Sequence, residues 1–187
     1  MGICPYCRQT LIPKCGAIKT WHWAHPQSDI CDPWREGETE WHLNWKRNFP
    51  KDYTEVIISK KQAKHIADYF NPVSNVTVEF QNSPLSFYER LERESFYNNL
   101  QWIVHVEKDT LHDTGSSLKF QNFWWKHPKQ WVTELPPVFC NIYLDSDHWP
   151  SDRMLKIIRI KKWKTRTYID GTFVMKELFI SKLNSDV

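Results

Sequence analysis

Two strand-like segments, Ile66-Ala67-Asp68 and Val76-Thr77-Val78-Glu79-Phe80-Gln81, carry polar side chains in otherwise β-forming sequence. Side chains alternate between the two faces of a strand, so Glu79 and Gln81 share one face. The short intervening segment is rich in Asn, Pro and Ser, which are typical of a turn. The sequence therefore predicts a strand, a turn and a return strand that bring Asp68 close to Glu79.

Two neighbouring carboxylates repel each other unless a cation lies between them. Ligation by oxygen alone suits Mg²⁺ or Mn²⁺, the ions that assist phosphodiester hydrolysis. The pattern thus favours a divalent-metal site at Asp68 and Glu79. The alternative is that both acids are surface residues at the edge of a sheet.

The composition suits a folded protein, with 41% hydrophobic and 15% aromatic residues, eleven Trp among them. The length of 187 residues favours one domain, or one domain with a small appendage. The mean hydropathy is -0.62, and no segment approaches the roughly 18 apolar residues of a membrane span. The first residues lack the features of a secretory signal. We therefore expect a cytoplasmic protein with reduced thiols and no membrane partner.

The net charge of +3 is unevenly distributed along the chain. Between residues 153 and 166 every charged side chain is basic, and apolar residues alternate with them, as in a strand with one basic face. The cations are Arg153, Lys156, Arg159, Lys161, Lys162, Lys164 and Arg166. Such a face favours phosphate contacts, although basic residues also keep a sheet edge soluble.

The amino-terminal segment predicts a zinc site. Cys4-Pro5-Tyr6-Cys7 is a CxxC motif, and His22, His25 and Cys31 follow it. Clustered Cys and His in a reducing compartment are typical of tetrahedral zinc. Cys4 and Cys7 supply two ligands, and the other two come from the set His22, His25 and Cys31.

We favour His25 with Cys31 as the remaining ligands, and Cys15 is a weaker candidate. A thioredoxin-like redox motif and an iron–sulfur cluster on four Cys are the alternatives. The predicted role is structural, because a segment this short buries too little apolar surface to fold without a metal.

The following residues predict an α/β core in the order helix, three strands, helix, strand. A helix is expected over residues 36–49, with Glu38, His42 and Lys46 on or beside its aromatic face. Strands are expected at 55–59, 64–70, 76–81 and 100–106, with a second helix beginning near Ser83 or Ser86. The predicted segments are a zinc-binding module at 1–35, a core at 36–107 and a β-rich extension at 108–187. In the extension, Asp170-Gly171 indicates a hairpin turn.

Several motifs in fixed order resemble the competence protein CoiA-like family. The resemblance covers most of the first 105 residues. It is carried by Cys4-Pro5-Tyr6-Cys7, His22-Trp23-Ala24-His25, Gly37-Glu38-Thr39-Glu40-Trp41-His42, Trp45-Lys46, Phe49-Pro50, Ile66-Ala67-Asp68, Val78-Glu79-Phe80-Gln81-Asn82-Ser83, Glu92-Arg93, Phe96-Tyr97 and Trp102-Ile103.

This resemblance implies a nuclease core of the PD-(D/E)XK type, in which Asp68 and Glu79 correspond to the metal-binding acids and Glu38 to the acid of the first helix. Gln81 stands where such nucleases usually have Lys. Neutral Gln forms hydrogen bonds but cannot stabilise developing negative charge as Lys does. That role would then move to another cation, such as Lys46 or Arg93.

We therefore expect a Mg²⁺- or Mn²⁺-dependent deoxyribonuclease, acting in DNA processing, recombination or defence. Glu38 would complete the metal shell that Asp68 and Glu79 begin, and His42 and Gln81 would position water or phosphate. The candidate DNA contacts are Lys46, Arg93, Lys126, Arg159, Lys161, Lys162 and Lys164. The alternative is a nuclease fold with weak or no turnover that binds DNA or a protein partner.

Overall fold

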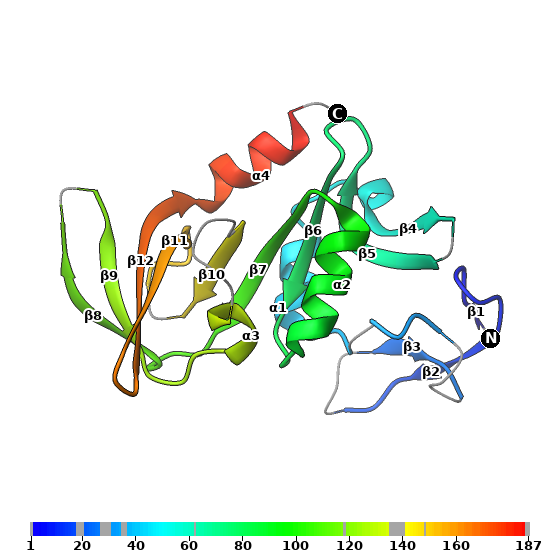
Figure 1. Cartoon of the computed structure of the whole chain (residues 1–187). Coiled ribbons are helices and arrows are strands. Elements are labelled where there is room, and N and C mark those ends of the chain that lie inside the picture. Colours follow the sequence, from blue (N-terminus) through cyan, green and yellow to red (C-terminus); the bar gives the residue numbers. More distant parts are fainter. Residues whose placement is uncertain are drawn as a thin grey trace. The chain divides into compact units, whose positions relative to one another are not determined.

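The computed structural model describes residues 2–17, 21–26, 31–34, 37–61, 63–117, 119–134, 141–147 and 149–185 (Figure 1). The chain divides into two compact units, Met1–Phe70 and Asn71–Val187. Among the described residues, none of the helices combines the length and the apolar character that a membrane crossing requires.

The first unit begins with a small antiparallel sheet of β1 (Gly2–Ile3), β2 (Thr10–Lys14) and β3 (His22–Ala24). A tight turn follows β1, in which the Cys4 backbone N–H donates to Gln9 O at 2.8 Å and the Arg8 N–H donates to Cys4 O at 2.9 Å. This turn folds the CxxC motif back on itself.

Helix α1 (Glu40–Lys46) follows, and it is shorter than the predicted helix. Thr39 is its N-cap and forms a capping box with His42, which fixes the start of the helix after Glu38. The predicted start at Glu36 lies outside the described residues. The short helix η1 (Lys51–Tyr53) leads into β4 (Thr54–Lys60), which pairs antiparallel with β5 (Ala63–Asn71).

The second unit contains a mixed sheet in the order β6-β7-β10-β11-β12-β9-β8. Its first three strands are parallel, and the other pairs are antiparallel. The strands are β6 (Val76–Gln81), β7 (Leu100–Val106), β8 (Leu111–Ser116), β9 (Gln121–Trp125), β10 (Ile142–Ser146), β11 (Arg153–Trp163) and β12 (Arg166–Met175).

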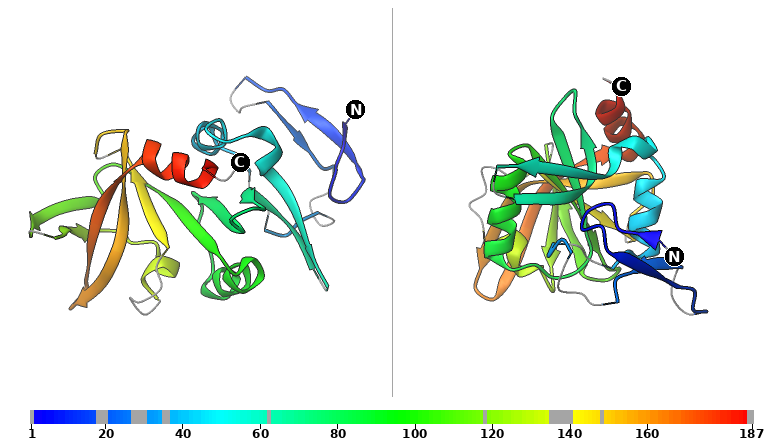
Figure 2. Two further views of the ribbon diagram at one scale, coloured as in Figure 1. Left: turned by 90° about the horizontal axis from the view of Figure 1, so that it is seen from above. Right: turned by 90° about the vertical axis from the view of Figure 1, so that its right-hand side faces the viewer.

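Three helices belong to this unit: α2 (Phe87–Tyr97), α3 (Gln130–Thr133) and α4 (Lys176–Asn184). Ser86 caps α2 by accepting from the Glu89 N–H at 3.0 Å, which selects Ser86 over Ser83 as the cap. Helix α2 lies beside β6 and β7 (Figure 2). The core between them includes Trp102, which is 1% exposed.

The predicted mixed α/β class is confirmed, and the chain is rich in β-structure. Along the chain the elements run α1, β4, β5, β6, α2, β7, which is the predicted order of helix, three strands, helix and strand. The three predicted segments, 1–35, 36–107 and 108–187, stay a prediction.

The predicted hairpin turn at Asp170-Gly171 is wrong, because both residues lie inside β12. The chain turns instead between Trp163 and Arg166, which face each other, and Lys164 adopts a left-handed φ of 52°. Gly171 is needed for a different reason. A Cβ on it would lie 2.6 Å from the backbone oxygen of Lys156 on β11, so the glycine permits a close approach of two strands.

Candidate functional site

The first unit brings together Cys4, Cys7, His25 and Cys31, whose potential ligand atoms all lie within 4.8 Å of one another. The Sγ atoms of Cys4 and Cys31 are 3.8 Å apart, and Cys7 Sγ is 3.1 Å from His25 Nε2. Cys4 and Cys7 lie in the turn after β1, His25 directly follows β3, and Cys31 comes later in the chain. The group could hold a metal ion such as zinc.

The spacing fits tetrahedral zinc, because Zn–S bonds of roughly 2.3 Å place two sulfurs about 3.8 Å apart. Three sulfurs and one imidazole nitrogen are also a usual donor set for structural zinc. The structure thus places His25 and Cys31, the predicted choice, beside Cys4 and Cys7. His22, on exposed β3, and the exposed Cys15 are outside this group. An iron–sulfur site on four Cys does not match a cluster that contains only three.

The thiols of Cys4 and Cys31 lie close to other thiols, and their pKa values shift in opposite directions. Burial alone raises the pKa of Cys4, but hydrogen bonds from the backbone N–H groups of Cys7 and Tyr6 outweigh it and lower the pKa to about 6. Burial and the neighbouring Cys4 and Cys7 raise the pKa of Cys31 to about 11. A bound divalent cation would remove this conflict between neighbouring thiolates.

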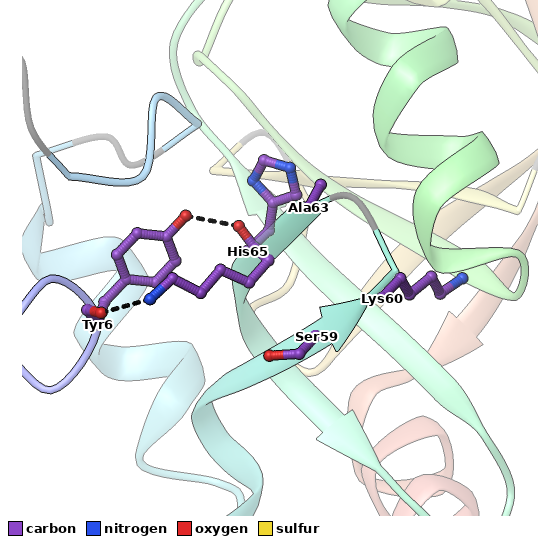
Figure 3. Close-up of a pocket in the computed structure, with 6 residues that line it drawn as sticks. Tyr6, Ser59, Lys60, Ala63 and His65 are labelled. Atoms are coloured by element: carbon purple, nitrogen blue, oxygen red, sulfur yellow. Dashed lines mark hydrogen bonds between the residues drawn. The ribbon is translucent and has the colours of Figure 1, made fainter.

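Tyr6, in the turn that carries Cys4 and Cys7, forms hydrogen bonds with β5 (Figure 3). The Tyr6 hydroxyl donates to Lys64 O at 2.6 Å, and Lys64 Nζ donates to Tyr6 O at 2.6 Å. The same ammonium lies 4.3 Å from the centre of the Tyr6 ring. These contacts border a shallow surface hollow, which Ser59 and Lys60 of β4 also line.

A second tie comes from Asp32, directly after Cys31. Its buried carboxylate lies 2.8 Å from His65 Nδ1 and accepts the Ile66 N–H at 2.6 Å. Trp34 stacks on the His65 ring with 3.3 Å between ring centres. The backbone of β5, just before Asp68, is therefore held by residues that flank the metal ligands.

Three carboxylates of the first unit meet at Lys46, the last residue of α1. Lys46 Nζ lies 2.6 Å from Glu38 Oε1 and 2.9 Å from Asp68 Oδ1, and it also pairs with Glu55 of β4. Glu38 precedes the helix cap and Asp68 lies in β5, so three chain segments converge. We call these four residues the carboxylate cluster. The sequence predicted Glu38, Lys46 and Asp68 here but missed Glu55.

The carboxylate cluster contains three acids and one base, so its formal charge is -2 when all four are ionised. Burial alone would lower the pKa of Lys46, but the charges of Asp68, Glu55 and Glu38 raise it above its ordinary value. Burial raises the pKa of Glu55, and Lys46 only partly counteracts this effect. The ammonium thus stays charged, and the site has negative charge in excess.

The backbone is distorted where the cluster meets β4. Glu55 has a φ of 55°, which is uncommon for a residue with a side chain. Thr54 pairs with Tyr69 and Val56 pairs with Ala67. Glu55 and Asp68 lie opposite each other between these two pairs but are not paired as regular strand residues. Such conformations cost roughly 1–3 kcal/mol and gather at functional sites. The distortion lies at Glu55 and opposite Asp68, two of the three acids of the carboxylate cluster.

His42 lies in the first turn of α1 and is 4% exposed. Its Nδ1 accepts the Thr39 backbone N–H at 3.2 Å and lies 2.8 Å from Thr39 Oγ1. The ring also contacts Trp41 edge to face. The structure therefore gives His42 a capping role that fixes the chain beside Glu38, and its predicted catalytic role stays a prediction.

In the second unit, Glu79 of β6 is 5% exposed and is held by Arg93 of α2. Arg93 Nη1 donates to Glu79 Oε2 at 3.1 Å, and Nη2 donates to Glu89 at 2.6 Å. Arg93 is therefore paired with two carboxylates, and its contact with DNA stays a prediction. Gln81 is 1% exposed, and its Nε2 donates to Ser83 O at 3.0 Å.

The other predicted DNA contacts lie in the second unit, and all are exposed. Lys126 follows β9, and Lys164 lies at the turn after β11. Arg159 and Lys161 of β11 both contact Asp170 of β12. In the predicted basic strand, residues 159–164 thus lie largely on the surface, whereas Met154, Leu155 and Ile157 are buried.

Comparison with known proteins supports the family resemblance in one segment. Residues 3–33 match the model of the competence protein CoiA, N-terminal domain. This segment contains Cys4, Cys7, His25 and Cys31, so the matched domain is the one that carries the candidate metal centre. No curated protein and no solved structure matches the chain.

Proposed function

With residues 3–33 as a CoiA-type amino-terminal domain, we propose that the chain is a metal-dependent deoxyribonuclease, with zinc as the structural ion of that domain. The observation that carries the proposal is the carboxylate cluster, in which Glu38, Glu55 and Asp68 converge at Lys46. The order of helix, three strands, helix and strand along the chain supports a PD-(D/E)XK-type core.

The donor set of the cluster fits Mg²⁺ or Mn²⁺, because it consists of carboxylate oxygens and carries an excess charge of -2. Asp68, Glu55 and Glu38 would hold the ion, and Glu79 stays a predicted ligand. Such an ion polarises a phosphoryl oxygen and makes bound water a stronger nucleophile.

The side chains of this chain would then divide the remaining work. Lys46 keeps its proton, since neighbouring carboxylates raise its pKa, and it would supply the positive charge that Gln81 lacks. Arg93 would hold Glu79 in a fixed orientation through their ion pair. His42 would keep the backbone before α1 in place, so that Glu38 presents its carboxylate to the cluster.

Substitution of either central acid should abolish cleavage. We expect Asp68→Ala and Glu79→Ala each to reduce Mg²⁺-dependent hydrolysis of linear DNA to the level without added metal. Glu177→Ala is the matched control, because Glu177 is an exposed acid on α4. Gel analysis of the products and circular dichroism of each variant provide the measurement. Full activity in either variant would remove that acid from the mechanism.

A second candidate function is DNA binding without hydrolysis. It is favoured by Gln81, whose amide is buried and donates to Ser83 O instead of placing a charge in the site. Linear, single-stranded and circular DNA should be incubated with the protein, with and without Mg²⁺ or Mn²⁺. Binding with no cleavage of any substrate would favour this function over the nuclease.

A further inference from the structure

Strands β11, β12, β9 and β8 lie side by side in the second unit (Figure 1). One face of these four strands carries cationic and aromatic side chains. Residues opposite each other in antiparallel strands share a face, as do alternate residues of one strand. The register gives rows on that face: Trp163 opposite Arg166; Lys161, Tyr168, Trp124 and His112; and Arg159, Asp170 and Asn122. We call these residues, with Lys126 beyond Trp124, the basic aromatic face.

This face points away from the core. On the opposite face, Ile169 and Leu111 are 0% exposed and Trp125 is 1% exposed, whereas Lys162 of β11 is exposed. Trp163, by contrast, is 59% exposed. A large exposed aromatic side chain beside other aromatic groups on the outer side of a sheet is typical of an interaction surface.

The aromatic rings of the face already stack with planar or charged groups. The Arg166 guanidinium lies 4.9 Å from the centre of the Trp124 ring. The His112 ring stacks on the Trp124 ring, with 4.8 Å between the ring centres and 26° between the ring planes. Lys164 Nζ lies 4.7 Å from the centre of the Trp163 ring. Flat aromatic surfaces flanked by cations are what nucleobases and their phosphates require.

The charge of the face is positive after its internal pairs are counted. Asp170 lies beneath Arg159 and Lys161 and accepts from both, at 2.5 and 2.8 Å. In the part of the chain that the structure describes, no ion pair involves Lys126, Lys164 or Arg166. The cations near Trp124 and Trp163 therefore remain available to an anionic polymer.

We propose that the basic aromatic face binds single-stranded nucleic acid, with bases stacked on Trp163 and Trp124 and phosphates beside Lys126, Lys161 and Arg166. A duplex hides the faces of its bases and would use only the cations, whereas a single strand uses both kinds of group. The ligand class follows from the proposed DNA chemistry, but this binding requires neither hydrolysis nor the carboxylate cluster.

Fluorescence anisotropy of a labelled oligothymidylate of about 15 nucleotides, without Mg²⁺, tests the proposal on the full chain. We expect Trp163→Ala to weaken binding about tenfold, because base stacking contributes strongly to such sites. Lys126→Ala with Arg166→Ala should lower the slope of log affinity against log salt by about 1.4, since each phosphate contact contributes about 0.7. Tyr88→Ala and Lys182→Ala, an exposed aromatic and an exposed cation elsewhere in the unit, are the matched controls.

Three results would overturn the proposal: equal affinity for a duplex, equal competition by polyglutamate, or unchanged binding in both sets of face variants. The nuclease proposal is tested separately. If the wild-type protein cleaves no DNA but binds the single strand through Trp163, the nuclease fails and the face stands. If Asp68→Ala loses cleavage while both sets of face variants bind normally, the face fails and the nuclease stands.

Discussion

Lys46→Met should destabilise the protein strongly in buffer without divalent ions, and Mg²⁺ should restore much of the loss. The ammonium is the only base of the carboxylate cluster, and its side chain is 10% exposed. Without it, Glu38, Glu55 and Asp68 would face one another with a formal charge of -3. Removal of one partner from a buried charge group costs about 3–5 kcal/mol, and we expect about 3 because the acids are partly exposed.

Thermal and urea unfolding of Lys46→Met and the wild type, with and without Mg²⁺, provide the measurement. Lys51→Met is the control, since Lys51 is exposed in the same unit and forms no ion pair among the described residues. Recovery by Mg²⁺ distinguishes a cation site from simple packing, because an ion that binds only the folded state stabilises it. A variant as stable as the wild type would mean that the three acids do not converge on this side chain.

The sequence predicted those parts of the site that depend on local patterns. Cys4 and Cys7 share one tight turn, so their joint ligation follows from spacing. Alternation along the strand that begins at His22 directs His22 and His25 to opposite faces, so only one of them can join the three Cys. This pattern can be seen in the sequence, and the structure shows that His25 is the one that joins. The strands at 76–81 and 100–106 were located to the residue, because β-branched and aromatic residues are continuous there.

The sequence could not reveal features that depend on contacts between distant segments. Glu55 begins a predicted strand like an ordinary surface acid, and only its φ of 55° and the ion pair with Lys46 identify it. Asp170-Gly171 has the composition of a turn, yet Gly171 serves the close approach of β11 and β12. Glu55 is identified by Lys46 of helix α1 and Gly171 by Lys156 of β11, so no local window of sequence contains either signal.

Loss of one ligand of the candidate metal centre should affect both the amino-terminal domain and DNA cleavage. We expect the wild-type protein to bind zinc and Cys31→Ser to lose it, because zinc needs its fourth ligand for a closed structural site. Without zinc the small β1-β2-β3 sheet should unfold, since structural zinc supplies about 10–16 kcal/mol of binding free energy in small domains. Elemental analysis and limited proteolysis measure these two effects.

Cleavage should fall as well, because the metal ligands are connected to the strand that carries Asp68. Asp32 follows Cys31 directly and fixes His65 and the Ile66 N–H of β5, while Tyr6 of the CxxC turn fixes Lys64. Cys15→Ser is the matched control, since Cys15 is exposed and lies outside the Cys/His group. If Cys31→Ser loses zinc but retains full Asp68-dependent cleavage, the amino-terminal domain does not support the carboxylate cluster. If it loses both while Cys15→Ser loses neither, the domain holds β5 in place for the proposed chemistry.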